Sequence, residues 1–187
     1  MREYTFDALY NKLGYVTQKA VLFSGTVEDN VFFGQSAAEK TDASLQAALS
    51  LSQAAEFVDK YPEKAAHPIA QLGRNVSGGQ KQRLSIARAL ARTPEILIFD
   101  DSFSALDYKT DATLREGLAK ELPGTTKIIV AQRISTIRNA DQILVLDRGE
   151  IAGLGTHDAL MASCTVYREI AMSQLSEEEL KKGGASK

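Results

Sequence analysis

Two short stretches of this chain carry residue types that could bind a phosphate-bearing ligand and a metal ion. Ser77-Gly78-Gly79-Gln80 opens a segment of helical periodicity that runs to about Ala91. A helix N-terminus presents free N–H groups and partial positive charge, and glycines let a ligand come close to them. Asp100-Asp101 ends an apolar run, and carboxylate oxygens suit Mg²⁺. Together the two stretches predict a nucleotide site.

The elements that must position these residues alternate between buried strands and helices, which predicts an α/β fold. The run from Glu95 to Phe99 lacks polar alternation, so we expect helices to cover both of its faces, as in a parallel sheet. A helical block from Asp42 to Tyr61 interrupts the alternation and predicts a helical subdomain at about 24–92. We expect one domain over 1–175, followed by a flexible charged tail at 176–187. The other predicted elements are strands at 13–17, 127–131, 142–146 and 151–154, and helices at 7–12, 77–91, 108–121, 135–139, 156–161 and 165–175.

Local signals mark several ends of these elements. Thr26 and Thr156 are expected to cap the helices that follow them, and Pro94 to end the helix before it. The residues 147–150 predict a hairpin turn between the last two strands. For His67 and His157 we expect structural roles.

Composition excludes several classes of protein. The net charge of −2 gives no reason to expect a nucleic-acid partner. The single cysteine, Cys164, excludes an internal disulfide and leaves no cysteine cluster for zinc. No apolar run approaches the roughly 20 residues that cross a bilayer. These features are typical of a protein without a membrane span of its own.

Several motifs resemble those of an ABC-transporter nucleotide-binding domain, in that family's order and over nearly the whole chain. NVSGGQKQRLSIARAL, starting at Asn75, resembles the signature motif and its helix. ILIFDD, ending at Asp101, is similar to the Walker B strand, and SALD, ending at Asp107, is similar to the D-loop. LGYVTQ, ending at Gln18, resembles the Q-loop strand. LFSGTVEDNV, which follows it, is similar to the corresponding segment of ABC exporters.

The resemblance implies part of a P-loop ATPase core that uses ATP and Mg²⁺. Asp100 would reach the metal through its water shell, and Gln18 would contact the same metal or the attacking water. The remaining cofactor-binding residues implied by the family motifs are Ser77, Gly78, Gly79, Gln80, Ser104 and Asp107, the last two at the face of a dimer.

Two departures from the family pattern fall on the hydrolytic site. The family has glutamate where this chain has Asp101, which is one methylene shorter, and a base must lie within hydrogen-bond reach of its proton. The family's switch histidine is replaced by Gln132, whose amide does not titrate near neutral pH. We therefore expect Asp101 and Gln132 to form a degenerate catalytic pair that hydrolyses ATP slowly.

A third departure concerns the phosphate-binding loop. Glycine nowhere precedes lysine in these 187 residues, so the Walker A motif is not found and the chain resembles the carboxyl-terminal part of a longer half-transporter. In this interpretation the strand beside the Asp100 strand is missing. We expect an unpaired apolar edge there, with marginal stability or aggregation of the chain.

The resemblance further implies a partner and a place in the cell. ABC domains dimerise head to tail, so this chain would lend its signature motif to a partner subunit with the consensus glutamate and histidine. This arrangement is similar to the degenerate half of heterodimeric bacterial multidrug-type exporters, held at the cytoplasmic face of the membrane by a transmembrane domain that this chain lacks. Alone, the fragment should be soluble. One alternative is a non-catalytic interaction module, and another is a soluble ABC ATPase of DNA repair or translation, which the exporter-like segment disfavours.

Overall fold

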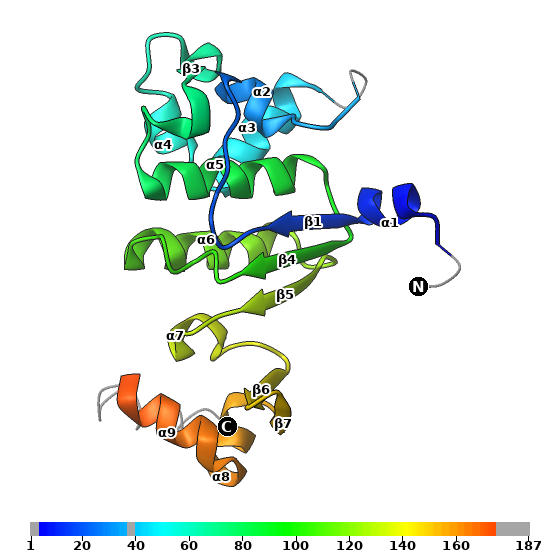
Figure 1. Cartoon of the computed structure of the whole chain (residues 1–187), viewed down its shortest axis with the longest axis vertical. Coiled ribbons are helices and arrows are strands. Elements are labelled where there is room, and N and C mark those ends of the chain that lie inside the picture. Colours follow the sequence, from blue (N-terminus) through cyan, green and yellow to red (C-terminus); the bar gives the residue numbers. More distant parts are fainter. Residues whose placement is uncertain (1–3, 37–39, 175–187) are drawn as a thin grey trace. The chain divides into compact units, whose positions relative to one another are not determined.

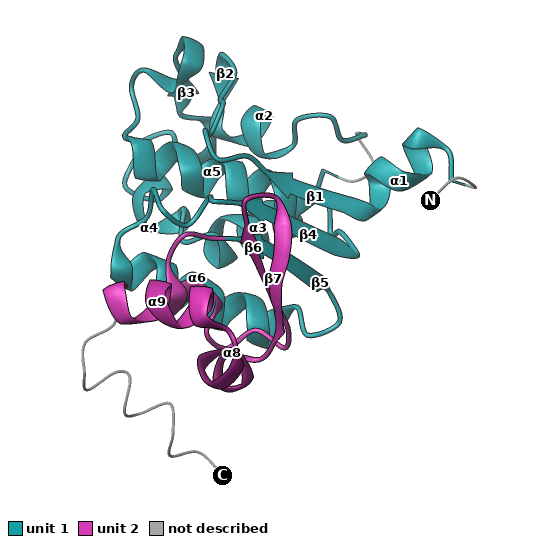
Figure 2. Cartoon of the chain, turned by 60° about the horizontal axis from the view of Figure 1, so that its bottom comes forward, with its two compact units in different colours: residues 1–130 teal, residues 131–187 magenta. Residues whose placement is uncertain are grey.

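Three parallel strands in the order β1–β4–β5 form the sheet of this computed structural model, which describes residues 4–36 and 40–174 (Figure 1). The strands are β1 (Leu13–Val16), β4 (Ile96–Asp100) and β5 (Thr126–Val130). The α/β fold is confirmed. The chain divides into two compact units, 1–130 and 131–187 (Figure 2). The charged tail predicted at 176–187 lies outside the described residues.

The Asp100 strand is the central strand of the sheet. β4 pairs with β1 from Leu13↔Ile96 onward and with β5 from Ile96↔Thr126 onward. Our expectation of an unpaired edge at β4 is therefore wrong, because both of its edges make parallel ladders. The outer edges of this sheet belong to β1 and β5.

The two faces of the sheet differ in burial. Val16, Leu97 and Phe99 are fully buried on one face. On the other, Tyr15 and Val130 keep 54% and 53% of their surface exposed. The expectation that both faces of β4 are covered is thus only half right, since the described helices of this unit pack against one face.

We still expect the isolated chain to self-associate. The reason is the exposed apolar face of the sheet and not an unpaired edge of β4. Exposed apolar surface on a sheet favours contact with other molecules. We expect the isolated chain to form concentration-dependent oligomers, with scattering mass rising with concentration in light-scattering measurements. A monomer that melts cooperatively at high temperature would contradict this expectation.

Helices α5 (Gly78–Ala91) and α6 (Tyr108–Glu121) belong to the first unit. Their N-termini are capped by the side chains of Ser77 and Asp107, respectively. α5 packs along β1 because Gly14 has no side chain: a Cβ there would lie 2.8 Å from Leu97 Cδ2 and 3.1 Å from the Ala89 carbonyl oxygen. Pro94 then directs the chain from α5 into β4, as predicted.

The region predicted as a helical subdomain contains short elements around α5. Besides α5, the described helices of this region are α2 (Val27–Val31), α3 (Asp42–Leu51) and α4 (Ala55–Val58), of which α2 and α3 contact α5. Helix α1 (Phe6–Lys12) precedes β1 and lies outside this region. Thr26 caps α2 with Asp29 as its capping-box partner, which confirms the predicted cap. Not predicted were the antiparallel pair β2 (Gly25–Thr26) and β3 (Pro68–Ile69), and the 3₁₀ turns η2 (Lys64–Ala66) and η3 (Gln71–Gly73).

In residues 131–174, the described part of the second unit, the chain forms a hairpin and three helices. Strands β6 (Ile143–Asp147) and β7 (Glu150–Gly155) pair through a turn at Arg148 and Gly149, whose φ values are +50° and +84°. This confirms the predicted hairpin. Helices α7 (Ile134–Ile137), α8 (His157–Ser163) and α9 (Thr165–Gln174) supply the rest of this unit's core.

A buried pair links the two last helices of this unit. The Nδ1 atom of His157, at the start of α8, lies 2.8 Å from the hydroxyl oxygen of Tyr167 on α9. Burial lowers the pKa of His157 below 6.5, Arg138 lowers it further, and Asp158 acts in the opposite direction. His157 therefore packs as a neutral side chain, which agrees with the structural role expected for it.

The stability of this unit should fall as pH falls through the ordinary histidine range. The unfolded chain binds the His157 proton more readily, so the folded state loses free energy relative to it as pH drops from about 8 to about 5.5. The thermal midpoint should decrease over this interval, and His157→Gln should flatten the decrease. Three carboxylates, Asp29, Glu63 and Asp107, have pKa values lowered from the ordinary 3.8 of aspartate or 4.5 of glutamate. They therefore titrate below about pH 5.5 and do not contribute to this decrease. If the thermal midpoint of His157→Gln depends on pH as steeply as that of the original chain, His157 is not the group that causes the decrease.

Candidate nucleotide-binding site

Asp100 is the last residue of the central strand, so β4 delivers its carboxylate to the carboxyl edge of the sheet. Its Oδ2 atom accepts a hydrogen bond of 2.9 Å from the hydroxyl of Tyr15 on β1. This bond holds the phenol proton and raises the pKa of Tyr15. Sequence reasoning missed Tyr15, and the contact becomes visible only when the parallel pairing of β1 with β4 is known.

Asp101 lies immediately beyond the strand in a left-handed backbone conformation with φ +45°. Aspartate tolerates this region better than most residues. Its amide donates to the Val130 carbonyl at 2.9 Å, and its carbonyl accepts from the Ser104 hydroxyl at 2.7 Å. Its carboxylate accepts a 3.1 Å hydrogen bond from the Gln18 amide. The structure therefore brings the predicted Q-loop residue into direct contact with the predicted hydrolytic residue.

The first turn of α5 is organised by a capping box. Ser77 Oγ accepts from the Gln80 amide at 3.3 Å, and Gln80 Oε1 accepts from the Ser77 amide at 2.8 Å. A hydroxyl oxygen that accepts a bond keeps its own hydrogen for donation. Ser77 can therefore cap the helix and still donate to a ligand.

The two glycines of this turn meet little within the chain. A Cβ on Gly78 would find nothing within 4 Å, and one on Gly79 would lie 3.5 Å from the Ala105 carbonyl oxygen, which is ordinary contact. Neither residue has a positive φ. Glycine at a helical position weakens a helix relative to alanine. Because the fold itself does not require these glycines, the open space at the helix N-terminus fits the approach of an external group.

The D-loop residues join this turn to the end of β4. Ser104 bonds to Asp101 as described, and Ala105 faces Gly79. Asp107 caps α6 by accepting from the Thr110 hydroxyl at 2.6 Å and from its amide at 2.9 Å. Both bonds lower the pKa of Asp107, and the bond from the Thr110 hydroxyl has the larger effect. Asp107 is therefore ionised at neutral pH, and its side chain is exposed.

Gln132 belongs to the second unit and is exposed there. Its carbonyl accepts a 2.8 Å bond from the side-chain amide of Gln174, whose oxygen accepts from the Ile134 amide at 2.9 Å. The segment before α7 is thus tied to the end of α9. The other predicted site residues, from Gln18 to Asp107, all lie in the first unit.

The oxygen donors fit Mg²⁺ held largely by water and phosphate. In the part of the chain that the structure describes, no three His, Cys, Asp or Glu side chains gather as a metal site. Asp100 offers carboxylate oxygens and is bonded to Tyr15, while Gln18 offers an amide oxygen and is bonded through its side-chain nitrogen to Asp101, the residue after Asp100. Mg²⁺ commonly keeps several waters and takes only one or two carboxylates from the protein.

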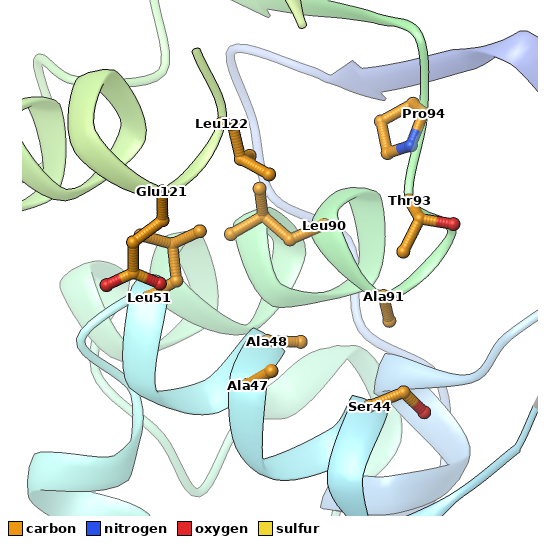
Figure 3. Close-up of a pocket in the computed structure, with 10 residues that line it drawn as sticks. All are labelled: Ser44, Ala47, Ala48, Leu51, Leu90, Ala91, Thr93, Pro94, Glu121 and Leu122. Atoms are coloured by element: carbon orange, nitrogen blue, oxygen red, sulfur yellow. The ribbon is translucent and has the colours of Figure 1, made fainter. Parts of the chain in front are cut away.

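An apolar pocket of about 160 Å³ lies elsewhere in the first unit (Figure 3). None of the predicted site residues lines it. Its walls come from α3, from the end of α5 with the turn after it, and from the end of α6: Ser44, Ala47, Ala48, Leu51, Leu90, Ala91, Thr93, Pro94, Glu121 and Leu122. Such a lining offers almost nothing to a triphosphate, so this pocket is not the candidate nucleotide site.

Comparison with known proteins decides the family. Residues 1–104, more than half of the chain, match the family model described as ABC transporter. The chain belongs to the ABC transporter family. The match contains Gln18, the signature turn, Asp100, Asp101 and Ser104, while Asp107 and Gln132 lie beyond it.

Individual relatives agree with this family. A putative ABC transporter ATP-binding protein of Mycoplasma pneumoniae, the MG014 homolog, is 42% identical over 176 residues. The match covers 90% of the present chain and 28% of that protein. Multidrug resistance protein 1 of Entamoeba histolytica is 40% identical over 181 residues, covering 96% of the chain and 14% of that protein.

The fold is also that of a solved ABC exporter. A bacterial Atm1-family ABC exporter with ATP bound superimposes with a TM-score of 0.88 at 35% identity, over 95% of this chain and 31% of that one. The present chain therefore spans less than a third of the length of each of these three proteins. Among the described residues, none of the helices is long and apolar enough to cross a membrane.

Proposed function

We propose that the ABC chain is the ATP-binding part of an exporter and that it contributes unequally to the two ATP sites of a head-to-tail dimer. It lends the turn from Ser77 to Gln80 to a partner's site and hosts a second site that hydrolyses ATP slowly. One observation carries the proposal: the carboxylate at the hydrolytic position, Asp101, is hydrogen-bonded to Gln18 at 3.1 Å. By contrast, the signature turn is capped and open to a ligand.

The hosted site is slow for a geometric reason. Asp101 is shorter than the family's glutamate, and its bond to Gln18 and its fixed backbone limit how far its oxygens reach. A catalytic group displaced by about 1 Å can lose about 10²-fold in rate. Gln132 adds to this loss, because its amide can hydrogen-bond a phosphate but does not exchange a proton near neutral pH.

Asp100 and Gln18 would hold Mg²⁺ in this site. The ion, when bound, supplies positive charge to the phosphate oxygens. Tyr15 keeps the Asp100 carboxylate oriented at the carboxyl edge of the sheet through its 2.9 Å bond. This arrangement supports binding of ATP more strongly than it supports hydrolysis.

The partner would be a second ABC ATPase subunit with the glutamate and histidine that this chain lacks, in a bacterial exporter of the heterodimeric, multidrug type. A transmembrane domain would hold both at the cytoplasmic face of the membrane. The multidrug-resistance relative and the Atm1-family exporter support this proposal at the level of the transporter class.

The test is to replace Asp101 by Glu and Gln132 by His in the complete protein, assembled with its partner. We expect ATP turnover at the hosted site to rise. Equilibrium dialysis with Mg-ATP addresses the alternative of a non-catalytic interaction module. Tight binding of ATP by the chain alone would exclude that alternative, whereas no binding by the complete, assembled protein would exclude the hosted site.

A further inference from the structure

Three consecutive residues of the Q-loop segment are each held by a side chain from elsewhere in the sequence. The Val16 carbonyl accepts from the Ser102 hydroxyl at 3.3 Å, and the Thr17 carbonyl accepts from the Gln82 amide at 3.2 Å. Gln18 itself donates to Asp101 at 3.1 Å. Asp101 and Ser102 lie in the turn after β4, whereas Gln82 lies on α5. The Q-loop segment therefore connects this turn to the signature helix.

The two side chains that hold the main chain are fully enclosed. Gln82 is 1% exposed and Ser102 is 0% exposed. A buried polar group that loses its partner costs more free energy than its bond contributes, so such bonds are kept. Any displacement of the Thr17 carbonyl must therefore either move Gln82 with it or leave a buried amide without this acceptor.

Gln82 stands in the second turn of α5, directly after the first turn formed by the signature motif. The same helix holds the Q-loop segment a second time, since Arg88 donates to the Val21 carbonyl at 2.9 Å. Arg88 also binds Asn30 through its Nε and Nη2 atoms, at 2.7 Å and 3.0 Å. The segment from Thr17 to Val21 is thus attached to α5 at both ends, and Gln82 is the attachment nearer to the signature turn.

We infer that Gln82 is a positioning residue that makes the signature turn follow the Q-loop. Nucleotide bound in the hosted site would act on Gln18, and Gln82 would carry the resulting shift of the neighbouring Thr17 carbonyl into α5. The turn from Ser77 to Gln80, offered to the partner's site, would move accordingly. This last consequence rests on the proposed function, whereas the mechanical link between Ser102, the Q-loop and α5 does not.

Hydrogen exchange on the full chain without nucleotide tests the link directly. The reporter is the Lys81 amide, which donates to the Ser77 carbonyl at 2.9 Å and so reads the first turn of α5. Ser102→Ala removes the bond at Val16, far along the chain from α5. We expect Lys81 exchange to speed up about fivefold in Ser102→Ala, the effect of about 1 kcal/mol.

The decisive measurement is a double-mutant cycle. In a Gln82→Met background, which keeps side-chain length and removes the donor, Ser102→Ala should no longer change Lys81 exchange. Gln82→Glu, also without the amide donor, provides the second background if the methionine variant does not fold. Gln46→Met, on an exposed face of α3, is the matched control and should leave the response to Ser102→Ala intact.

An equal response to Ser102→Ala with and without the Gln82 amide, or no response in either case, would overturn the inference. In the assembled transporter, Gln82→Met should lower turnover at the partner's site while ATP affinity at the hosted site stays within about twofold, a difference well under 1 kcal/mol. A cycle that succeeds while this second result fails would reject the division of roles between the two sites and leave the link standing.

Discussion

Turnover at the hosted ATP site should rise by about 10²-fold when Asp101→Glu and Gln132→His are combined in the complete protein with its partner. Glutamate is one methylene longer than Asp101, so its carboxylate reaches farther from the backbone that the Val130 and Ser104 bonds hold in place. The histidine adds a group that titrates near neutral pH. Turnover by the hosted site is measured in assemblies whose partner subunit carries an inactivated glutamate, so that the partner's own site is silent.

Each single substitution should give a smaller gain than the pair, because groups that act together on one reaction are not additive. Asp59→Glu, at an exposed position of the first unit, makes the same chemical change away from the site and should leave turnover unaltered. If restoring both residues leaves turnover unchanged, degeneracy is not what limits this site. The signature function would be unaffected by that result.

Gly78→Ala should lower the rate of ATP hydrolysis at the partner's site by about 10²-fold or more, without destabilising the chain. A Cβ on Gly78 meets nothing within 4 Å in the chain itself, so the loss would arise only when a ligand approaches the turn. Alanine also has the higher helix propensity, which favours α5 by up to about 1 kcal/mol. Stability and function should therefore change in opposite directions.

Denaturant midpoints of the chain and ATPase rates of the assembly measure the two effects. Gly124→Ala is a matched control, since a Cβ there also finds open space but outside the signature turn. It should change neither ATPase rate nor assembly. Normal ATP hydrolysis by the Gly78→Ala assembly would show that the signature turn of this chain does not contact nucleotide. A loss of folding stability would show instead that the glycine serves the fold.

The second unit illustrates how well local signals work. The turn at Arg148-Gly149 and the cap at Thr156 form as the sequence predicts, because hairpin turns and caps depend on neighbouring residues. The prediction about the faces of β4 failed in part, because the run from Ile96 to Phe99 says only that its residues are apolar. Whether a helix covers each face depends on segments far away in the sequence.

The site shows the same division. From its residues alone, the chain revealed a capped, glycine-bearing helix start at Ser77 and a carboxylate pair at a strand end, because these signals lie within a few consecutive positions. Only the tertiary structure placed Gln18 on Asp101 and Tyr15 on Asp100, contacts between residues 83 and 85 positions apart. Such contacts follow from the order and register of parallel strands. Parallel strands are joined by long crossover connections, so signals within a few consecutive residues do not show which strands become neighbours.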